Sequence, residues 1–214
     1  MKVAELVKDP YNVVLTGVGG QGNVIASRML GNIFARKGYY ITIGETFGAS
    51  QRGGSVMSHL RISLRSIWSP QIPKGKADLI VALEPIEALR VIAAYGKPGV
   101  KVLSNTRPVH TVGVIAGDQA YPPLDELKTT LAQLTDELCF VEATDEALKL
   151  GKPILSNVIM LGAIAGLRVL PFDTADFREV AAETLKGDML EMNVKVFDLG
   201  KRLAGQGICQ KILS

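Results

Sequence analysis

The chain has 214 residues, of which 47% are hydrophobic and 21% are charged, and its net charge is +3. These values are typical of one globular domain with a full hydrophobic core. The small positive charge does not favour a nucleic-acid-binding or lipid-binding surface, and no run of basic residues alternates with aromatic ones. We therefore expect neither nucleic acid nor a membrane among its partners.

The cysteines and the apolar runs indicate the compartment. Cys139 and Cys209 do not have the spacing of a zinc site, and two thiols are too few for a four-cysteine iron–sulfur cluster. Such sparse use of cysteine favours a reducing environment. The first residues lack the apolar centre of a secretory signal, and the longest apolar run, Val158–Leu167, is too short to cross a bilayer. We expect a cytoplasmic protein.

The first organised segment predicts a strand, a glycine turn and a helix, as in a Rossmann-like βα unit. Asn12–Thr16 is the predicted strand, and Gly17–Gly22 (GVGGQG) carries the motif G-x-G-x-x-G. From Ile25 onward, apolar residues recur at helical spacing. Glycines in such a turn let the backbone approach a ligand, and free N–H groups at the helix start face an anion. The motif alone is weak evidence, and a glycine turn that binds nothing is the alternative.

The middle of the chain alternates strands and helices. Tyr39–Gly44 is a predicted strand, and Glu45 follows it where dinucleotide-binding folds keep an acid for the ribose. Ser55–Ser63 alternates in polarity with one polar face, which favours an edge strand or an interface. The remaining predicted elements are a strand Ala77–Leu83, a helix Glu84–Tyr95, strands Lys101–Ser104 and Thr111–Ile115, a helix Pro122–Leu134, a strand Leu138–Glu142 and a helix Thr144–Leu150 capped by Thr144 or Asp145.

From about residue 156 the pattern is helical. Asn157–Leu170 is apolar all round and is predicted to be buried, whereas Asp173–Lys186 and Met189–Leu203 each have one apolar face. Gly205–Ser214 is expected to be a loose tail. We predict one α/β domain over residues 1–214, Rossmann-like, with a mainly parallel sheet flanked by helices and a helical C-terminal segment packing on it. The broad stripe on Met189–Leu203 must cover a sheet or a partner, so the isolated chain is expected to self-associate or need a partner.

A second glycine loop carries further candidate ligand-binding residues, namely Ser50, Gln51, Arg52, Gly53 and Gly54. In a parallel sheet this loop and the first glycine turn would open on the same crevice, where ligands of α/β sheets bind. The guanidinium of Arg52 can bind a carboxylate or phosphate through two parallel hydrogen bonds. A surface arginine in a mobile loop is the alternative.

No catalytic or metal-binding constellation is visible. His59 has no predicted partner and is expected to be a packed or interfacial histidine rather than a general base. No Ser/His/Asp or Cys/His arrangement and no metal-ligand spacing can be read from the sequence. Gly17–Gly22 together with Glu45 leaves open a self-sufficient NAD(P)-dependent dehydrogenase, and a module that only binds a nucleotide or an acyl-CoA is a third possibility.

Four segments resemble the gamma-type subunit of 2-oxoacid:ferredoxin oxidoreductases, with the greatest similarity to the beta subunit of indolepyruvate:ferredoxin oxidoreductase. They read NVVLTGVGGQGNVIASRML, GETFGASQRGGSVMSHLRIS, PKGKADLIVALEPIEALR and SNTRPV. The resemblance extends from about Asn12 to Leu203, and the pairing of GxGGQG with SQRGGSV is its specific part. Ala49 stands where many relatives have a methionine, a difference that concerns packing more than chemistry.

The resemblance implies an accessory subunit, inactive alone, of an enzyme that decarboxylates a 2-oxoacid oxidatively. The substrate would be indolepyruvate, pyruvate or a branched-chain type, the acyl acceptor coenzyme A and the electron acceptor ferredoxin. Thiamine diphosphate, magnesium and [4Fe-4S] clusters would lie on partner subunits, so neither catalytic nor metal-binding residues are expected here. Coenzyme A is the implied ligand of this chain. Its binding residues would be Gly17, Gly19, Gly20, Gln21, Gly22, Ser50, Gln51, Arg52, Gly53 and Gly54.

Overall fold

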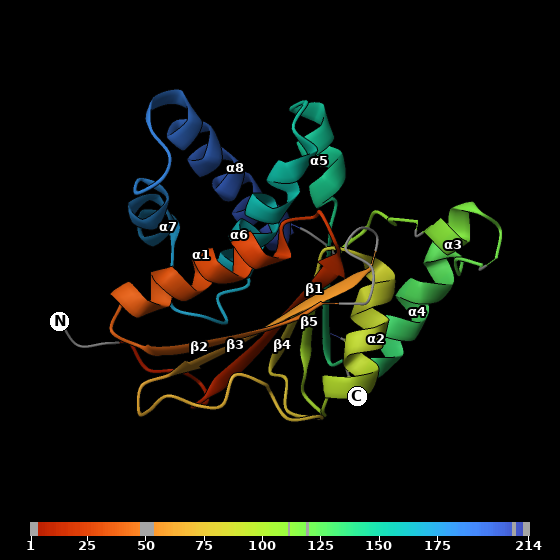
Figure 1. Ribbon diagram of the computed structural model, residues 1–214, viewed down its shortest axis with the longest axis horizontal. Coiled ribbons are helices and arrows are strands. Elements are labelled where there is room, and N and C mark those ends of the chain that lie inside the picture. The colour runs from red at the N-terminus through yellow and green to blue at the C-terminus, as the bar shows by residue number, and fades with distance from the viewer. Residues whose placement is uncertain (1–3, 48–53, 111, 119, 207–208, 212–214) are drawn as a thin grey trace.

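The computed structural model describes residues 4–47, 54–110, 112–118, 120–206 and 209–211. These residues form one seven-stranded sheet with helices on both faces (Figure 1). The strands are β1 (Tyr11–Val18), β2 (Tyr40–Phe47), β3 (Ser55–Ser63), β4 (Leu79–Ala82), β5 (Lys101–Asn105), β6 (Glu137–Val141) and β7 (Cys209–Lys211). The helices are α1 (Asn23–Arg36), α2 (Pro85–Tyr95), α3 (Val112–Ile115), α4 (Leu124–Leu134), α5 (Ala143–Lys149), the 3-10 turn η1 (Pro153–Leu155), α6 (Ser156–Gly166), α7 (Thr174–Ala181) and α8 (Gly187–Gln206).

The strand order is β2-β3-β1-β4-β5-β6-β7. Strands β1, β4, β5 and β6 pair in parallel, while β3 is antiparallel to both β1 and β2, and β7 is antiparallel to β6. The predicted α/β class is confirmed, as is a sheet in which most strands run in one direction. The connection from β1 leads through α1 toward β2, whereas that from β4 leads through α2 to β5 on the other side. The carboxyl ends of β1 and β4 therefore form a topological switch point, where α/β sheets bind ligands.

Successive side chains of the central strands point to opposite faces of the sheet, and the interior is therefore divided into two hydrophobic cores. Val13 and Leu15 of β1 pack into the core under α1, α6, α7 and α8, and Val14 packs into the core under α2 and α4. Figure 1 shows these two groups of helices on opposite sides of the sheet. Because β4 continues the pattern, with Val81 in the first core and Ile80 in the second, both faces of the sheet are buried.

Two glycines let helices α6 and α8 meet backbone to backbone. A Cβ atom on Gly162 would overlap the carbonyl oxygen of Phe197, and one on Gly200 would overlap that of Ile159. The helical C-terminal segment therefore packs on the sheet as a close helix pair. Phe197 of α8 is fully buried in the first core.

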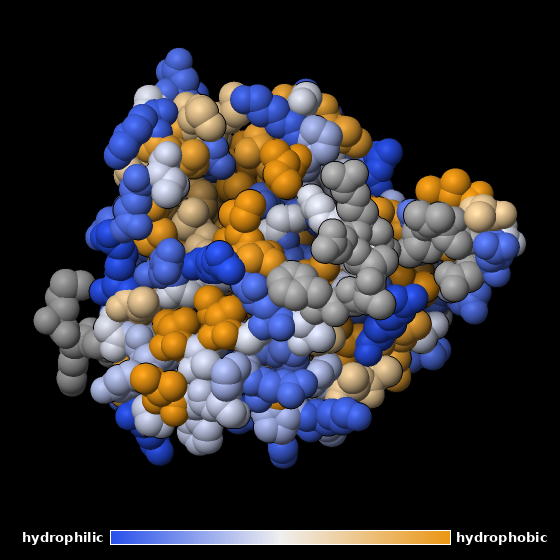
Figure 2. Space-filling model, viewed as in Figure 1, coloured by the Kyte–Doolittle hydropathy of each residue, from blue (hydrophilic) through white to orange (hydrophobic). Residues whose placement is uncertain are grey.

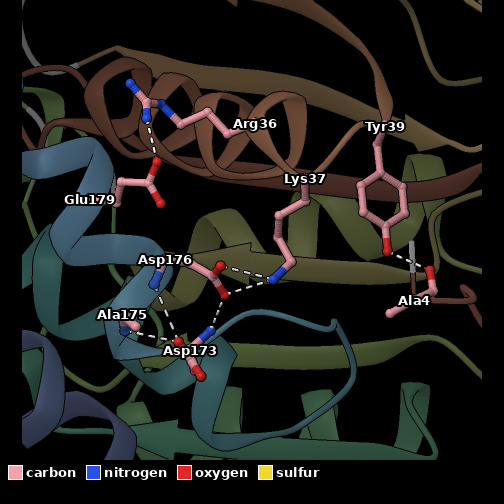
Figure 3. A network of polar contacts seen from close by, with 8 residues as sticks. All are labelled: Ala4, Arg36, Lys37, Tyr39, Asp173, Ala175, Asp176 and Glu179. Carbon is pink, nitrogen blue, oxygen red and sulfur yellow. Dashed lines mark hydrogen bonds and ion pairs between the residues drawn. The ribbon is translucent and has the colours of Figure 1, made fainter. Parts of the chain in front are cut away.

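Charged contacts attach α7 to the end of α1 (Figure 3). Lys37 Nζ lies 2.8 Å from Asp176 Oδ1, and Arg36 Nη1 lies 2.5 Å from Glu179 Oε1. Asp173 begins α7 with a capping box, because its carboxylate accepts hydrogen bonds from the N–H groups of Ala175 (2.8 Å) and Asp176 (3.2 Å). Short-range capping thus fixes the start of a helix that the ion pairs then position.

Replacing Asp173 with alanine should lower the free energy of unfolding by about 1 kcal/mol, because two N–H groups lose their acceptor. For a chain of this size that corresponds to a decrease in melting temperature of about 2–4 °C. Asp173→Asn is the matched control, since its side-chain oxygen can still cap. Equal melting temperatures for Asp173→Ala and the unmodified chain would contradict this assignment.

Four local predictions are wrong. Ser55–Ser63 is not an edge strand, because β3 lies between β1 and β2 and its polar residues are buried. The predicted strand over Thr111–Ile115 is replaced by the helical turn α3, with Thr111 itself outside the described residues. Helix α5 follows Glu142 without a side-chain cap. The tail is not loose throughout, because α8 extends to Gln206 and β7 pairs with β6.

His59 is packed, as expected for a histidine that is not a general base. Its ring is 1% exposed in the middle of β3 and meets the ring of Tyr95 edge to face at 5.0 Å. Neither ring nitrogen has a hydrogen-bond partner among the described residues. Burial lowers the pKa of the His59 imidazole, because the charged form loses its hydration.

The pKa of His59 makes the fold sensitive to acid. In the unfolded chain the imidazole takes up a proton below about pH 6.5, whereas the folded chain resists protonation down to its lowered pKa. The contribution of His59 to stability should be fully present above pH 6.5 and fall by up to about 1.4 kcal/mol per pH unit between the two pKa values. His59→Phe should flatten this loss in urea unfolding at pH 5 to 7.5. The control variant His110→Gln, at an exposed histidine, should lose as much stability at low pH as the unmodified chain. If His59→Phe also lost as much stability as the unmodified chain, the explanation would be wrong.

Candidate ligand site at the glycine turn

The side-chain amide of Gln21 closes the turn after β1. Its Oε1 accepts a hydrogen bond from the N–H of Val18 (2.7 Å), and its Nε2 donates to the carbonyl of Leu83 (2.9 Å) just beyond β4. Asn105 Nδ2 donates to the same Leu83 carbonyl (3.0 Å) from the end of β5. Side-chain amides therefore connect the carboxyl ends of three parallel strands. Both ends of the Gln21 amide are engaged within the chain, so Gln21 shapes the turn in this structure.

Most other N–H groups of the turn are also engaged. The N–H of Gly19 donates to the carbonyl of Gly54 (2.9 Å), and that of Gln21 donates to Val18 (3.2 Å). In the orientation that satisfies its amide, Asn23 accepts from the N–H of Gly17 (3.1 Å) and donates to the carbonyl of Thr16 (3.2 Å). These bonds hold the turn against both β1 and the second loop.

Five N–H groups are left without a partner among the described residues. They belong to Gly20, Gly22, Asn23, Val24 and Ile25, the last three forming the first turn of α1. The unpaired N–H groups of a helix start carry a partial positive charge. An anion placed here would meet several convergent donors.

A cavity of about 340 Å³ opens at this point. The glycine turn, the first turn of α1, Val56 of β3 and Ile154 of η1 line it. Its volume is at the lower end of ligand pockets, enough for one part of a large ligand. The sequence did not point to Asn23, Val56 or Ile154, because only folding brings β3 and η1 to the turn.

Gly22 is required here by geometry. Its φ of +85° is a left-handed conformation, and a Cβ atom would overlap Asn157 Nδ2 of α6. Gly20 also has a positive φ, +101°, but open space surrounds the place of its missing side chain. Gly22 therefore lets α6 approach the turn, and Gly20 leaves the mouth of the cavity open.

The last residue of the second glycine loop, Gly54, lies against the first glycine turn. Ser50, Gln51, Arg52 and Gly53 lie outside the described residues. Gly54 is described, and the hydrogen bond from Gly19 reaches its carbonyl. Gly54 reaches the turn because β2 and β3 form an antiparallel pair and β3 adjoins β1, with Val18 opposite Ser55 in the register.

Glu45 does not occupy the position that nicotinamide binding would need. It lies inside β2, and β3 separates this strand from β1. Its carboxylate oxygen Oε1 lies 3.3 Å from Arg28 Nε of α1. The acid is thus paired within the chain rather than adjacent to the glycine turn.

A buried carboxyl group stands next to the turn on the other side of Leu83. Glu84 is fully buried, caps α2 by accepting from the N–H of Glu87 (3.1 Å) and accepts from Tyr121 Oη (2.5 Å). Burial raises the pKa of Glu84, and the hydrogen bonds from Tyr121 and the backbone oppose that rise. No local pattern in the sequence indicates this contact, because Tyr121 is 37 residues away in the chain.

Within the described parts of the chain, no group of three or more His, Cys, Asp or Glu side chains could hold a metal ion. The described residues therefore offer no ligand set that fits a magnesium ion or a cluster. In the same residues, no helix combines the length and apolarity that a membrane span requires.

Known proteins share both the sequence and the fold. The chain is 36% identical over 195 residues to the indolepyruvate oxidoreductase subunit IorB of Thermococcus kodakarensis, a match that covers 91% of this chain and 96% of that one. The pyruvate oxidoreductase subunit PORC of Thermotoga maritima superposes with a TM-score of 0.67 at 20% identity, covering 91% and 97%. A 2-oxoglutarate:ferredoxin oxidoreductase of Magnetococcus marinus superposes with a TM-score of 0.69 at 20% identity, covering 96% of this chain and 33% of that one.

The structure defines a Rossmann-like α/β protein with a cavity at a glycine turn. The family model for pyruvate ferredoxin/flavodoxin oxidoreductase matches residues 12–203, and the chain belongs to this family. The predicted resemblance is confirmed, and so is the predicted role as a small subunit of a 2-oxoacid oxidoreductase.

Gln21→Ala should destabilise the protein by about 1–3 kcal/mol, because the N–H of Val18 loses its acceptor in a partly buried place. Chemical unfolding measures this difference. Gln71→Ala, at an exposed glutamine, should stay within about 0.5 kcal/mol of the unmodified chain. If both variants unfolded at the same denaturant concentration, Gln21 would not be the closing contact of the turn.

Proposed function

We propose that this chain is the accessory subunit that holds coenzyme A at the glycine turn, beside a catalytic centre on another subunit. The observation that carries the proposal is the group of five N–H donors at the mouth of the 340 Å³ cavity. Coenzyme A presents phosphate groups, the ligand class that such donors recognise. The Magnetococcus marinus oxidoreductase, which shares the fold, was solved with coenzyme A bound.

The two loops would divide the recognition of the ligand. The first turn of α1 supplies N–H donors and no positive side chain among the described residues that line the cavity. Arg52 on the second loop is the proposed source of positive charge, with Ser50, Gln51 and Gly53 beside it. The hydrogen bond between Gly19 and Gly54 supports this division, because it holds the root of the second loop at the turn.

A nicotinamide dinucleotide fits the site less well. An NAD-binding fold places its ribose-binding acid at the end of the strand next to the glycine strand. Here β3 takes that position, and Glu45 is paired with Arg28. The predicted alternative of a self-sufficient dehydrogenase therefore has no observation in its favour.

The reaction would be completed by partner subunits. We propose that they carry thiamine diphosphate, magnesium and the [4Fe-4S] clusters, and that electrons leave the complex to ferredoxin. The similarity to subunit IorB favours indolepyruvate as the 2-oxoacid. In this arrangement the present chain binds and orients the acyl acceptor, and is inactive alone.

The assembled complex tests coenzyme A binding by calorimetric titration. Val24→Glu places a carboxylate among the N–H donors, where it should stabilise the start of α1 yet repel phosphate. We expect its affinity for coenzyme A to fall at least tenfold. Val24→Gln, of the same size but neutral, should bind within about threefold of the unmodified complex.

Two results would contradict the proposal. Equal affinity for coenzyme A in Val24→Glu and Val24→Gln would place the ligand elsewhere. A higher affinity for NAD or NADP than for coenzyme A would favour the dehydrogenase hypothesis.

A further inference from the structure

One surface beside the cavity is unusually apolar. Six large apolar side chains are exposed along the first turn of α1, the α5–η1 segment and the first half of α8: Ile25, Leu148, Leu150, Ile154, Met189 and Met192. We call them the apolar strip. The other exposed large apolar residues in the described parts of the chain are spread over the N-terminal segment, β2, the loop after β3, α3 and α4. Contiguous exposure of this kind marks an interaction site.

The strip is continuous with the candidate ligand site. Ile25 and Ile154 line the glycine-turn cavity, so one end of the strip is the wall of that cavity. Lys152 Nζ lies 3.5 Å from Met192 Sδ, which joins the η1 segment to α8. Figure 2 shows apolar surface gathered between α5 and α8 and above the start of α1.

The far end of the strip is hollowed. Leu150, Met192 and Leu199 line a groove of about 460 Å³ along α8, together with the charged residues Asp188, Glu191, Lys195 and Arg202. An apolar centre with a charged rim of both signs is the composition of a protein–protein interface. Methionines suit such a groove, because their flexible side chains adapt to a partner.

We infer that the apolar strip docks the subunit that carries thiamine diphosphate, an inference that rests on the proposed function. The cavity is open at the strip, so a subunit seated there would form its missing wall and bring a catalytic centre to the bound acyl acceptor. In the Magnetococcus marinus oxidoreductase this fold makes up one third of a longer chain. The present fold is a separate chain, so it needs a noncovalent contact with its partner where the longer chain has a covalent link.

The test uses the tagged full-length chain, produced in its own organism and purified anaerobically with its complex. Thiamine diphosphate per tagged chain is measured by conversion to fluorescent thiochrome. Leu150→Asp/Met192→Asp should reduce this value at least tenfold. The matched control is Ile67→Asp/Leu134→Asp, which puts two charges on exposed apolar residues elsewhere: Leu134 is 48% exposed and Leu150 is 47% exposed. The control should retain the wild-type value.

A photo-crosslinking residue at position 192 keeps the test informative if the double variant does not fold. It should attach to the thiamine-bearing chain, and the same residue at position 134 should not. Wild-type thiamine content in a folded Leu150→Asp/Met192→Asp complex would overturn the docking surface and leave the proposed function standing. Crosslinks between copies of this chain would assign the strip to a second copy instead. A wild-type preparation without thiamine diphosphate would contradict the proposed function itself.

Discussion

The amide of Gln21 fixes the part of the molecule on which the site depends. The connections that follow the parallel strands β1 and β4 leave in opposite directions. Gln21 links the two strand ends by accepting from Val18 and donating to Leu83. With the turn held in this way, the N–H groups of Gly20 and of the first helical turn remain directed to the cavity. The contacts of Gln21, Asn23 and Gly54 together determine which N–H groups the fold uses and which are left for a ligand.

The second constraint is the antiparallel position of β3. In a doubly wound sheet, the strand beside β1 is parallel to it and is connected through a helical crossover. Here β3 follows β2 directly and pairs with both β2 and β1, so Gly54, the last residue of the second glycine loop, is hydrogen-bonded to Gly19 of the first turn. Because β3 lies between β1 and β2, Glu45 of β2 is also kept away from the turn. The position of β3 therefore brings Gly54 to the glycine turn and removes the contact that a dinucleotide would need.

Much of this architecture could be predicted from the sequence. The glycine turn, the helix after it and the parallel strands follow from local patterns, since apolar runs and helical periodicity are set by residues close together in the chain. The polar face of Ser55–Ser63 misled because His59 and Arg61 are buried, and polarity alone does not distinguish a solvated face from a packed one. Pairing of the last three described residues with β6 had no local signal, because a short edge strand depends on its partner.

The site was predictable only in part, for the same reason. Glycines that need left-handed backbone, such as Gly22, stand out in a sequence. Which N–H groups remain free depends on tertiary contacts of Gln21, Asn23 and Gly54, and these cannot be read from spacing. The apolar strip could be suspected from the wide stripe of α8, but its extension through η1 to the cavity wall required the fold. Local sequence patterns thus identified the glycine turn, and the structure showed which of its N–H groups have no partner among the described residues.

The most direct test is an experimental structure of the assembled complex with coenzyme A. We predict phosphate oxygens within hydrogen-bonding distance, about 3 Å, of the N–H groups at Gly20, Gly22 and the first turn of α1. The Gln21 amide should also keep its contacts with Val18 and Leu83. Coenzyme A bound away from the glycine turn, with those N–H groups facing only solvent or another subunit, would contradict it.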